Sequence, residues 1–313
     1  MAVCALLLAG CGNNYPDRDF KDDMRRLISD LGSYAKTEQA GFLVVPQNGL
    51  ELLTLDGDPS GEVSALYTAS VDGVGREDLF YGYNRDDKAT PKRETEYFQE
   101  FLDLLRVADI PVLVTDYCST PENVDDAIAQ NLAADYVPFP APDRELRLIP
   151  AYPAIPVNVN SDNITSLAEV RNFCYLINPD LYGSAEVLIA ALQATDFDLL
   201  ILDLFVDGTA LTSDQVNSLK TKNNGGSRLV IAYCSVGEAE NYRYYWDPAW
   251  EDNPPLWLDK ENPDWEGNFK VWYWEAEWQA LLFGNPDAYV DRILAAGFDG
   301  AYLDLVEAYE YFE

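Results

Sequence analysis

Short apolar runs recur along the chain and alternate with amphipathic stretches. The runs are rich in Val, Ile, Leu, Tyr and Phe, and apolar residues fill most of their positions rather than every second one. Such continuous runs are typical of parallel strands that are buried on both faces. We therefore predict eight strands, over residues 42–46, 110–116, 135–139, 173–177, 199–204, 229–234, 269–274 and 300–304.

Helical periodicity fills most of the intervals between these strands. Capping residues or prolines mark several helix entrances, for example Thr120-Pro121 and Asn285-Pro286. Eight strands that alternate with helices in a chain of 313 residues predict an α/β fold, and specifically a (β/α)8 TIM barrel. A doubly wound open sheet is the alternative. The predicted helices cover residues 95–107, 123–132, 184–195, 213–222 and 287–296.

The two ends of the predicted domain complement each other. The last strand ends near Asp304, which leaves little chain for an eighth outer helix, whereas an amphipathic helix over residues 19–38 precedes the first strand. We predict that this N-terminal helix fills the eighth helix position, so that the two ends are neighbours.

Two segments are predicted to be long loops. Residues 49–91 are rich in Gly and Asp, and residues 140–161 are rich in Pro. Long ordered loops in compact domains are usually functional or connecting segments. We expect the first loop to cover the active site and the second to join the two halves of the domain.

Composition excludes several kinds of chemistry. The chain contains no histidine, so a Ser-His-Asp triad, a Cys-His pair and a His-ligated zinc site are all excluded. Acidic residues outnumber basic ones by 54 to 21, for a net charge of −33, which argues against nucleic acid as a partner. The acidity fits a solvated surface suited to high salt, or a field that attracts a cationic substrate. We expect neither a cofactor nor a metal.

The first residues resemble a lipoprotein leader. Residues 1–10 are apolar and end in Leu8-Ala9-Gly10, directly before Cys11. We predict a signal peptide over residues 1–10, lipidation at Cys11, a tether over residues 11–19 and a single domain over residues 20–313. A buried apolar strand is the alternative for the first segment. The lipid-anchored reading places the protein at the cell envelope or cell surface, outside the cytoplasm. Cys118, Cys174 and Cys234 are expected to be buried small hydrophobic residues.

Acidic residues gather where the predicted strands end. In a (β/α)8 barrel the catalytic groups lie at the carboxyl ends of the strands, and several unpaired acids there would be costly unless they were functional. For any single acid, capping of the next helix is an equally good explanation. The candidates are Asn48 with Glu51, Asp116 with Tyr117, Asp203, Glu238, Glu275 and Asp304.

Aromatic residues form a second cluster. All seven tryptophans lie between residues 246 and 278, with Tyr242, Tyr244 and Tyr245 directly before them. Aromatic rings stack on the apolar faces of sugars, although ordinary packing of a long loop would use the same residues. The acids among these rings favour a polar sugar cleft.

Four motifs together resemble a known family. They are Pro-Gln-Asn-Gly at 46–49, Tyr-Cys-Ser-Val-Gly-Glu-Ala-Glu-Asn-Tyr-Arg at 233–243, Trp-Glu-Gly-Asn at 265–268 and Gly-Phe-Asp-Gly-Ala-Tyr-Leu-Asp at 297–304. This combination resembles the endo-α-1,4-polygalactosaminidase-like glycoside hydrolases, once labelled cysteinyl-tRNA synthetase-like. In that family the Pro-Gln-Asn-Gly strand follows the other motifs, so the resemblance implies a circularly permuted order with a junction at residues 140–161.

The resemblance implies a barrel that cleaves a galactosamine-containing polysaccharide with one Asp and one Glu. Asp304 matches the Asp, and Glu51, just after Pro-Gln-Asn-Gly, is the expected Glu. A partly deacetylated polymer of this kind is cationic, which suits an acidic rim. The residues expected to bind substrate are Asn48, Asp116, Tyr117, Asp203, Glu238, Trp272 and Trp274.

Two other classes of function stay open at this point. One is a non-catalytic, glycan-binding surface lipoprotein on a degenerate barrel, and the other is a structural envelope protein without a cleft. The expected partners are a polysaccharide and, only through a lipid at Cys11, a membrane. We expect a monomer.

Overall fold

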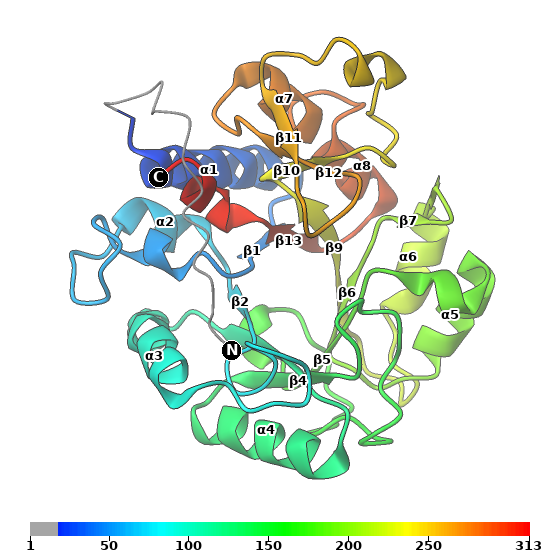
Figure 1. Cartoon of the computed structure of the whole chain (residues 1–313). Helices are drawn as coiled ribbons and strands as arrows, with labels where there is room; N and C mark the ends of the chain where they lie inside the picture. The colour runs from blue at the N-terminus through cyan, green and yellow to red at the C-terminus, as the bar shows by residue number, and fades with distance from the viewer. Residues whose placement is uncertain (1–17) are drawn as a thin grey trace.

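The centre of the fold is built from parallel strands. The structure is a computed structural model that describes residues 18–313. Five parallel strands form one sheet in the order β1-β13-β9-β6-β5, and three form another in the order β2-β3-β4 (Figure 1). Their bounds are β1 Leu43–Pro46, β2 Val74–Glu77, β3 Val112–Tyr117, β4 Val137–Ala141, β5 Phe173–Leu176, β6 Leu199–Leu202, β9 Leu229–Ser235 and β13 Gly300–Asp304.

The two sheets share one interior. A single parallel bridge between Gln47 and Gly75 joins the end of β1 to β2. On the other side, the rings of Phe139 in β4 and Phe173 in β5 lie 5.2 Å apart. Tyr302 of β13 reaches across the interior to Tyr175 of β5, with ring centroids 5.0 Å apart. The arrangement is therefore compatible with a TIM-like fold.

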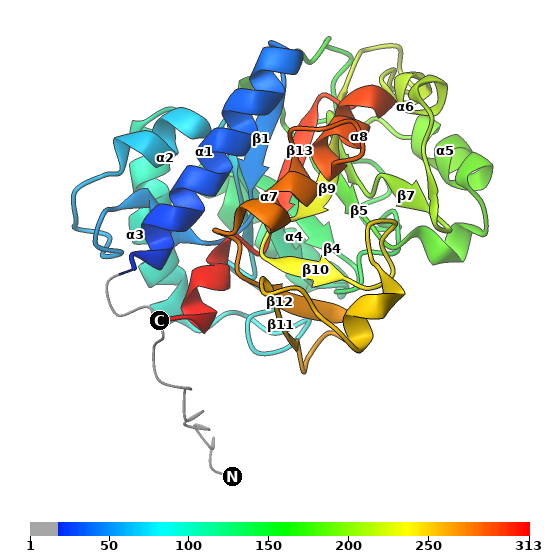
Figure 2. The ribbon, with the colours of Figure 1, turned by 90° about the horizontal axis from the view of Figure 1, so that it is seen from above.

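Eight helices are present within residues 18–313, and they surround the strands (Figure 2). The six helices that the sequence predicts are confirmed, with ends that differ by a few residues, whereas the short helices α2 and α7 were not predicted. Side-chain caps explain several starts, since Ser184 accepts from Val187 N and Thr212 accepts from Gln215 N. The bounds are α1 Phe20–Glu38, α2 Ala65–Ser70, α3 Lys92–Val107, α4 Pro121–Ala133, α5 Ala185–Gln193, α6 Ser213–Leu219, α7 Ala276–Leu282 and α8 Tyr289–Ala296.

The two ends of the described chain lie side by side, as the sequence predicts (Figure 1 and Figure 2). Helix α1 begins with the ring of Phe20 stacked on Phe312 at 5.4 Å, and Lys21 forms an ion pair with Glu313. Further along α1, Tyr34 donates a hydrogen bond to Asp291 of α8 at 2.5 Å. These contacts place α1 beside the last helices of the chain.

One predicted parallel strand is wrong and another was missed. Residues 269–274 do not join the central sheet. Instead, β12 (Asn268–Val271) pairs antiparallel with β10 (Glu238–Glu240) and with β11 (Leu258–Glu261). The missing parallel strand is β2, inside the segment that was predicted to be a loop. The apolar pattern failed there because β2 reads Val-Gly-Arg-Glu, with one apolar side chain.

The rest of the fold consists of short elements and loops. The 142–166 stretch contains neither helix nor strand, which confirms the predicted Pro-rich connector. Cys118, Cys174 and Cys234 are buried and free, as predicted. Cys11 and the predicted leader lie outside the described residues. Within residues 18–313, no helix is long and apolar enough to cross a membrane. A hairpin pairs β7 (Phe205–Val206) with β8 (Thr209–Ala210), and 3-10 helices cover Leu50–Leu53, Leu167–Glu169, Pro179–Tyr182, Pro248–Glu251 and Val306–Tyr311.

Gly75 is the position in β2 at which the interior tolerates no side chain. A Cβ atom there would overlap the hydroxyl and ring of Tyr302, which is fully buried. We expect Gly75→Ala to lower the free energy of unfolding by roughly 1–3 kcal/mol, as overpacking of a close-packed interior does. Urea unfolding measures this change. The matched control is Gly41→Ala, because no atom lies within 4 Å of the added methyl group, and an equal loss in both variants would contradict the packing argument.

Candidate active site

Two carboxylates meet at the carboxyl ends of two parallel strands that lie on either side of β1. Asp304 is the last residue of β13, and Glu77 is the last residue of β2. Gln47, just after β1, bridges them, since its Nε2 atom donates to Glu77 Oε2 at 2.6 Å and to Asp304 Oδ1 at 3.1 Å. The two oxygens that share this donor are thus separated by no more than the sum of these two distances.

The turn after β1 is shaped to hold Glu77. Asn48 and Gly49 both adopt left-handed backbone conformations, with φ of 60° and 55°. The Asn48 side chain donates from Nδ2 to Glu77 Oε2 at 3.1 Å and accepts at Oδ1 from the backbone N–H of Glu77 at 3.1 Å. Asn and Gly are the residues that tolerate this conformation best, which explains the Asn-Gly pair in the motif.

The turn after β13 is shaped to hold Asp304. Leu305 lies at a φ of 59°, a strained conformation for a leucine. Its backbone N–H donates to Asp304 Oδ1 at 2.8 Å, and Tyr233 of β9 donates from its hydroxyl to Asp304 Oδ2 at 2.8 Å. A Cβ atom on Gly237 would overlap the Leu305 carbonyl oxygen, so the glycine after β9 is required for this turn to pack.

Removal from water raises the pKa of every carboxyl group at this centre. Burial, and then the nearby charge of Glu77, raises the pKa of Asp304 to about 7. Burial also raises the pKa of Glu77, while hydrogen bonds from Tyr117 and Asn48 act in the opposite direction. Glu307 is a third member, because burial and the charge of Asp304 raise its pKa to about 8. Carboxyl groups of this kind can exchange protons near neutral pH.

Asp203 lies at the same end of the sheet and forms part of an ion-pair cluster. It follows β6, and its carboxylate lies 2.7 Å from the Arg243 guanidinium, which also binds Glu240 at 2.6 Å. A cavity of about 1150 Å³ opens beside this cluster. Its lining combines acids with aromatic rings: Glu145, Asp180, Asp203, Asp207, Phe205, Tyr242 and Tyr244, together with Arg147 and Arg243.

The other predicted acids are engaged elsewhere. Asp116 is buried, and it accepts hydrogen bonds from the backbone N–H groups of Phe80 and Tyr81 and from Asn131. Glu238 is fully buried in β10 and pairs with Lys270 at 2.5 Å. The contacts of Asp116 and Glu238 hold neighbouring segments in place. Neither acid shares a hydrogen-bond donor with Asp304 within residues 18–313.

Glu51 lies in the 3-10 helix Leu50–Leu53, where tyrosines engage it. It accepts hydrogen bonds from the hydroxyls of Tyr97 at 3.1 Å and Tyr309 at 3.0 Å. Within residues 18–313, Glu51 shares no hydrogen-bond donor with Asp304, unlike Glu77. Glu51 thus lies apart from the Gln47 bridge, and its assignment as the second carboxylate stays a prediction.

The predicted aromatic cleft residues separate into two places. Tyr117, at the end of β3, donates its hydroxyl hydrogen to Glu77 Oε1 and belongs to the carboxylate centre. Trp272 and Trp274 are stacked on each other at 6.2 Å, and Trp274 packs against Phe20 and Phe312. The two tryptophans thus lie where α1 begins.

Sequence reasoning missed Glu77, Gln47 and Tyr233 as members of the centre. Glu77 lay in a predicted loop, and the single apolar side chain of its strand gave no pattern that could have found it. Gln47 and Tyr233 belonged to the family-like motifs but carried no assigned role. Gln47 directly follows β1, at the strand end that the sequence analysis had already marked, but its bridging role was not predicted.

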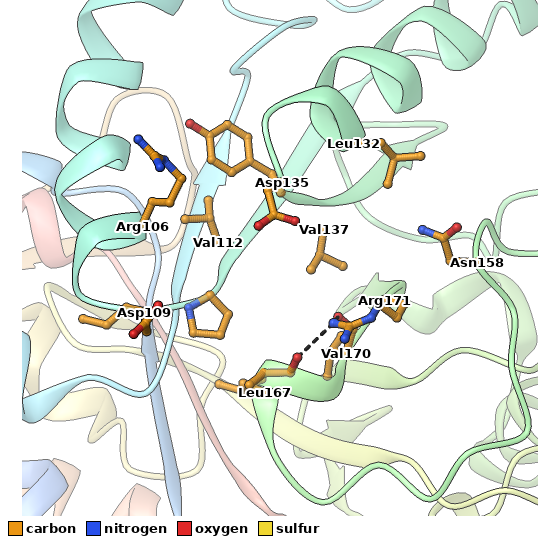
Figure 3. Close-up of a pocket in the computed structure, with 14 residues that line it drawn as sticks. Arg106, Asp109, Val112, Leu132, Asp135, Val137, Asn158, Leu167, Val170 and Arg171 are labelled. Carbon is orange, nitrogen blue, oxygen red and sulfur yellow. Dashed lines mark hydrogen bonds between the residues drawn. The ribbon is translucent and has the colours of Figure 1, made fainter.

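A second pocket lies at the opposite ends of the strands. It has a volume of about 560 Å³ and is lined by Val112 and Val137, the first residues of β3 and β4. Figure 3 shows Arg106 and Arg171 on opposite sides of this pocket, and Arg171 donates to the backbone oxygen of Ala168 at 2.9 Å. The carboxylate centre is at the other end of the sheet, where the catalytic groups of TIM-like enzymes lie.

A parallel α/β core with paired carboxyl groups at its carboxyl-terminal edge is compatible with glycoside hydrolysis. The family model of glycoside-hydrolase family GH114 matches residues 170–313. This match confirms the resemblance to the endo-α-1,4-polygalactosaminidase family that the motifs indicated. Asp304, Tyr233 and Asp203 lie within the matched segment, whereas Glu77 and Gln47 lie before it.

Three curated relatives match part of the chain, and each is described as an uncharacterized protein. A protein of Methanocaldococcus jannaschii is 37% identical over 155 residues, which is 49% of this chain and 42% of that protein. A protein of Deinococcus radiodurans is 40% identical over 131 residues, or 42% of this chain and 40% of the relative. A protein of Thermotoga maritima is 35% identical over 120 residues, or 38% and 36%. The matches thus span less than half the length of each relative.

Glu307 gives a test of the electrostatics of the centre. Its Oε2 atom is sealed from solvent and has no hydrogen-bond partner within residues 18–313. Because its folded pKa of about 8 exceeds the ordinary value of 4.5, the folded state binds the extra proton, and the stability this gives is lost as pH rises from about 5 to about 8.

We expect Glu307→Gln to become more stable than the wild-type protein as pH rises through this window, by on the order of 1–3 kcal/mol. Urea unfolding from pH 5 to pH 9 measures the difference. Glu251→Gln is the matched control, because Glu251 is exposed and its loss removes the same charge. A Glu307→Gln curve that runs parallel to the wild-type curve would rule out the proposed proton uptake.

Proposed function

We propose that this protein is a glycoside hydrolase whose catalytic pair is Asp304 and Glu77. The observation that carries the proposal is the Gln47 amide, which donates to both carboxylates at the carboxyl ends of β13 and β2. Glycoside hydrolysis needs two carboxyl groups that flank the scissile bond and differ in protonation. The match of residues 170–313 to family GH114 supports the same class of reaction.

The surroundings of the two groups favour different roles. Asp304, with a pKa raised to about 7, is suited to donate a proton to the leaving oxygen. Glu77 receives hydrogen bonds from Gln47, Asn48 and Tyr117, which favour its charged form and suit it to act as the nucleophile.

The spacing of the pair favours a retaining reaction. Carboxyl groups lie roughly 5–5.5 Å apart in retaining enzymes and roughly 6.5–9.5 Å apart in inverting ones, where a water molecule must fit between sugar and base. The two oxygens that share Gln47 Nε2 are separated by no more than the sum of the 2.6 Å and 3.1 Å contacts, which is shorter than the inverting range. The proposal therefore includes a covalent glycosyl intermediate on Glu77.

The proposed substrate is a galactosamine-containing, cationic polysaccharide cut within the chain. The cavity beside Asp203 has a volume of about 1150 Å³, which is large enough to admit sugar residues. Its lining includes both acidic and aromatic side chains. Acids attract free amino groups, and the rings of Tyr242 and Tyr244 offer faces for sugars. The net charge of −33 acts in the same direction.

The finer architecture is part of the proposal. The eight parallel strands would close into a (β/α)8 barrel, with β4 next to β5, and the order would be permuted relative to the family. The Pro-Gln-Asn-Gly motif lies before residue 170, outside the matched segment, yet its Gln47 reaches Asp304 near the end of the chain. Anchoring through Cys11 at the cell surface would bring the site to extracellular polysaccharide.

Three variants test the assignment of the pair. We expect Glu77→Gln and Asp304→Asn each to lower the rate of reducing-end release from partly deacetylated polygalactosamine by roughly 10²–10⁴-fold, because each removes a group that acts on the scissile bond. Glu51→Gln is the matched control and is expected to retain most of the activity. Full activity in Glu77→Gln, or binding of the polymer without turnover by the wild-type protein, would refute the proposal.

The pH dependence follows from the role of Asp304. Because the acid must be protonated, kcat/KM is expected to fall as pH rises above about 7 and to approach a tenfold loss for each further pH unit. Initial rates between pH 4 and pH 9 at constant ionic strength measure this limb. A rate that keeps rising beyond pH 8 would show that Asp304 does not act as the acid.

A further inference from the structure

Arg144 belongs to the loop after β4, and its guanidinium reaches back to the loop after β2. Nη2 donates to Asp78 Oδ1 at 3.0 Å, and Nη1 donates to Asp78 Oδ2 at 3.2 Å. The same group donates to the Gly82 carbonyl oxygen at 2.9 Å and to Asp86 at 3.0 Å. One side chain therefore holds the segment that directly follows Glu77.

The flat face of the same guanidinium covers Tyr117. Arg144 Cζ lies 4.0 Å from the centroid of the Tyr117 ring, close enough for a stacked cation–π contact. The Tyr117 hydroxyl donates to Glu77 Oε1, and the tyrosine is almost fully buried. Guanidinium, phenol ring and carboxylate thus form one continuous stack of contacts that ends on Glu77.

The backbone beside this stack is closely packed at Gly82. Asp78 has a φ of 57° and Gly82 a φ of 118°. A Cβ atom on Gly82 would overlap Asp78 Oδ1 and would lie 3.1 Å from Tyr117 Cβ. Asp78 and Tyr117, which are the chain neighbour and the hydroxyl donor of Glu77, are therefore both packed against Gly82 as well as against Arg144.

Charge gives Arg144 an influence on Glu77 beyond packing. The guanidinium lowers the pKa of Glu77, against the burial that raises it. Burial raises the pKa of Tyr117 well above its ordinary value, so the hydroxyl keeps its proton and stays a donor. The ionisable and charged groups that act on Glu77 or feel its charge are Asp78, Arg144, Arg76, Tyr117, Tyr175, Tyr302, Asp304 and Glu307.

We propose that Arg144 is a positioning residue that acts through Tyr117 and Asp78 to hold Glu77 in its orientation toward Asp304. Arg144 donates to neither carboxylate of the pair, so its effect is indirect. The inference rests on the proposed role of Glu77 as nucleophile. It assigns the Pro-rich connector a part in the site, since the connector carries Arg144.

The test compares Arg144→Met, which keeps much of the side-chain length but removes the charge, with Arg144→Lys, which keeps the charge but loses the planar stack. We expect Arg144→Met to lower kcat by tenfold or more with a smaller change in KM, and to move the acid limb of kcat/KM upward by about one pH unit. Arg144→Lys should also lower kcat, but it should move the acid limb by no more than about half a pH unit, because the charge is kept. Asp86→Asn is the control for loop anchoring alone and should leave the pH profile unchanged.

A second readout needs no turnover. In protein carrying ¹³C at the glutamate side-chain carboxyl, the Glu77 resonance is assigned by its loss in Glu77→Gln, and its titration midpoint should rise in Arg144→Met. Tyr117→Phe should raise it too, and adding Arg144→Lys to Tyr117→Phe should change it little further.

A titration curve of Arg144→Met that superimposes on the wild-type curve would overturn the inference, even if activity falls. If Arg144→Met does not fold, the comparison of Tyr117→Phe with the Tyr117→Phe, Arg144→Lys double variant takes its place. An unchanged Glu77 titration midpoint in Tyr117→Phe would then overturn the inference. An inactive wild-type protein whose Glu77 midpoint still responds to Arg144 would refute the proposed function and leave the positioning of Glu77 intact.

Discussion

Three carboxyl groups share one poorly hydrated end of the parallel strands, and the rest of the site is built around that constraint. Like charges at short range in such surroundings repel strongly, so the groups can coexist only with donors placed between them and with protons partly retained. Most of the hydrogen bonds to these carboxylates come from neutral donors. The Gln47 amide bridges Glu77 and Asp304, and Tyr117 and Tyr233 each bind one carboxylate. A neutral bridge fixes the spacing without neutralising either group, which leaves both available for proton transfer.

The backbone meets the same constraint with strained turns. Asn48, Gly49 and Leu305 all have positive φ values, and they lie directly beside Gln47 and Asp304. At Leu305 this conformation costs free energy and persists because the surrounding structure compensates for it, which is common at functional sites. Here the two turns pack together, because a Cβ atom on Gly49 would meet Val306 at 2.7 Å. The turn after β1 and the turn after β13 are thus packed against each other at the site.

Sequence patterns predict the parts of this protein in which burial alone determines the residue type. Seven of the eight parallel strands follow from apolar runs, and Asp304 follows from its place at a strand end. β2 escaped because Tyr302 fills the space beside Gly75, so the strand needs few apolar side chains of its own. Glu77 was therefore not predicted either, and nearness in sequence to the Pro-Gln-Asn-Gly motif favoured Glu51 instead.

The bridge through Gln47 joins residues far apart in the chain, which no local pattern reveals. The opposite error occurred at β12, which was predicted to be a parallel strand of the central sheet. Its apolar residues pack instead in an aromatic cluster outside that sheet.

The most direct test of the account is to trap the covalent intermediate. A 5-fluoro glycosyl fluoride of galactosamine slows both steps of a retaining reaction, and proteolysis with mass spectrometry then locates the labelled carboxylate. The account predicts one label per protein on Glu77, with Glu77→Gln unlabelled and Glu51→Gln labelled as in the wild-type protein. A label on Glu51 or Asp304, or turnover that inverts the anomeric configuration without any label, would contradict it.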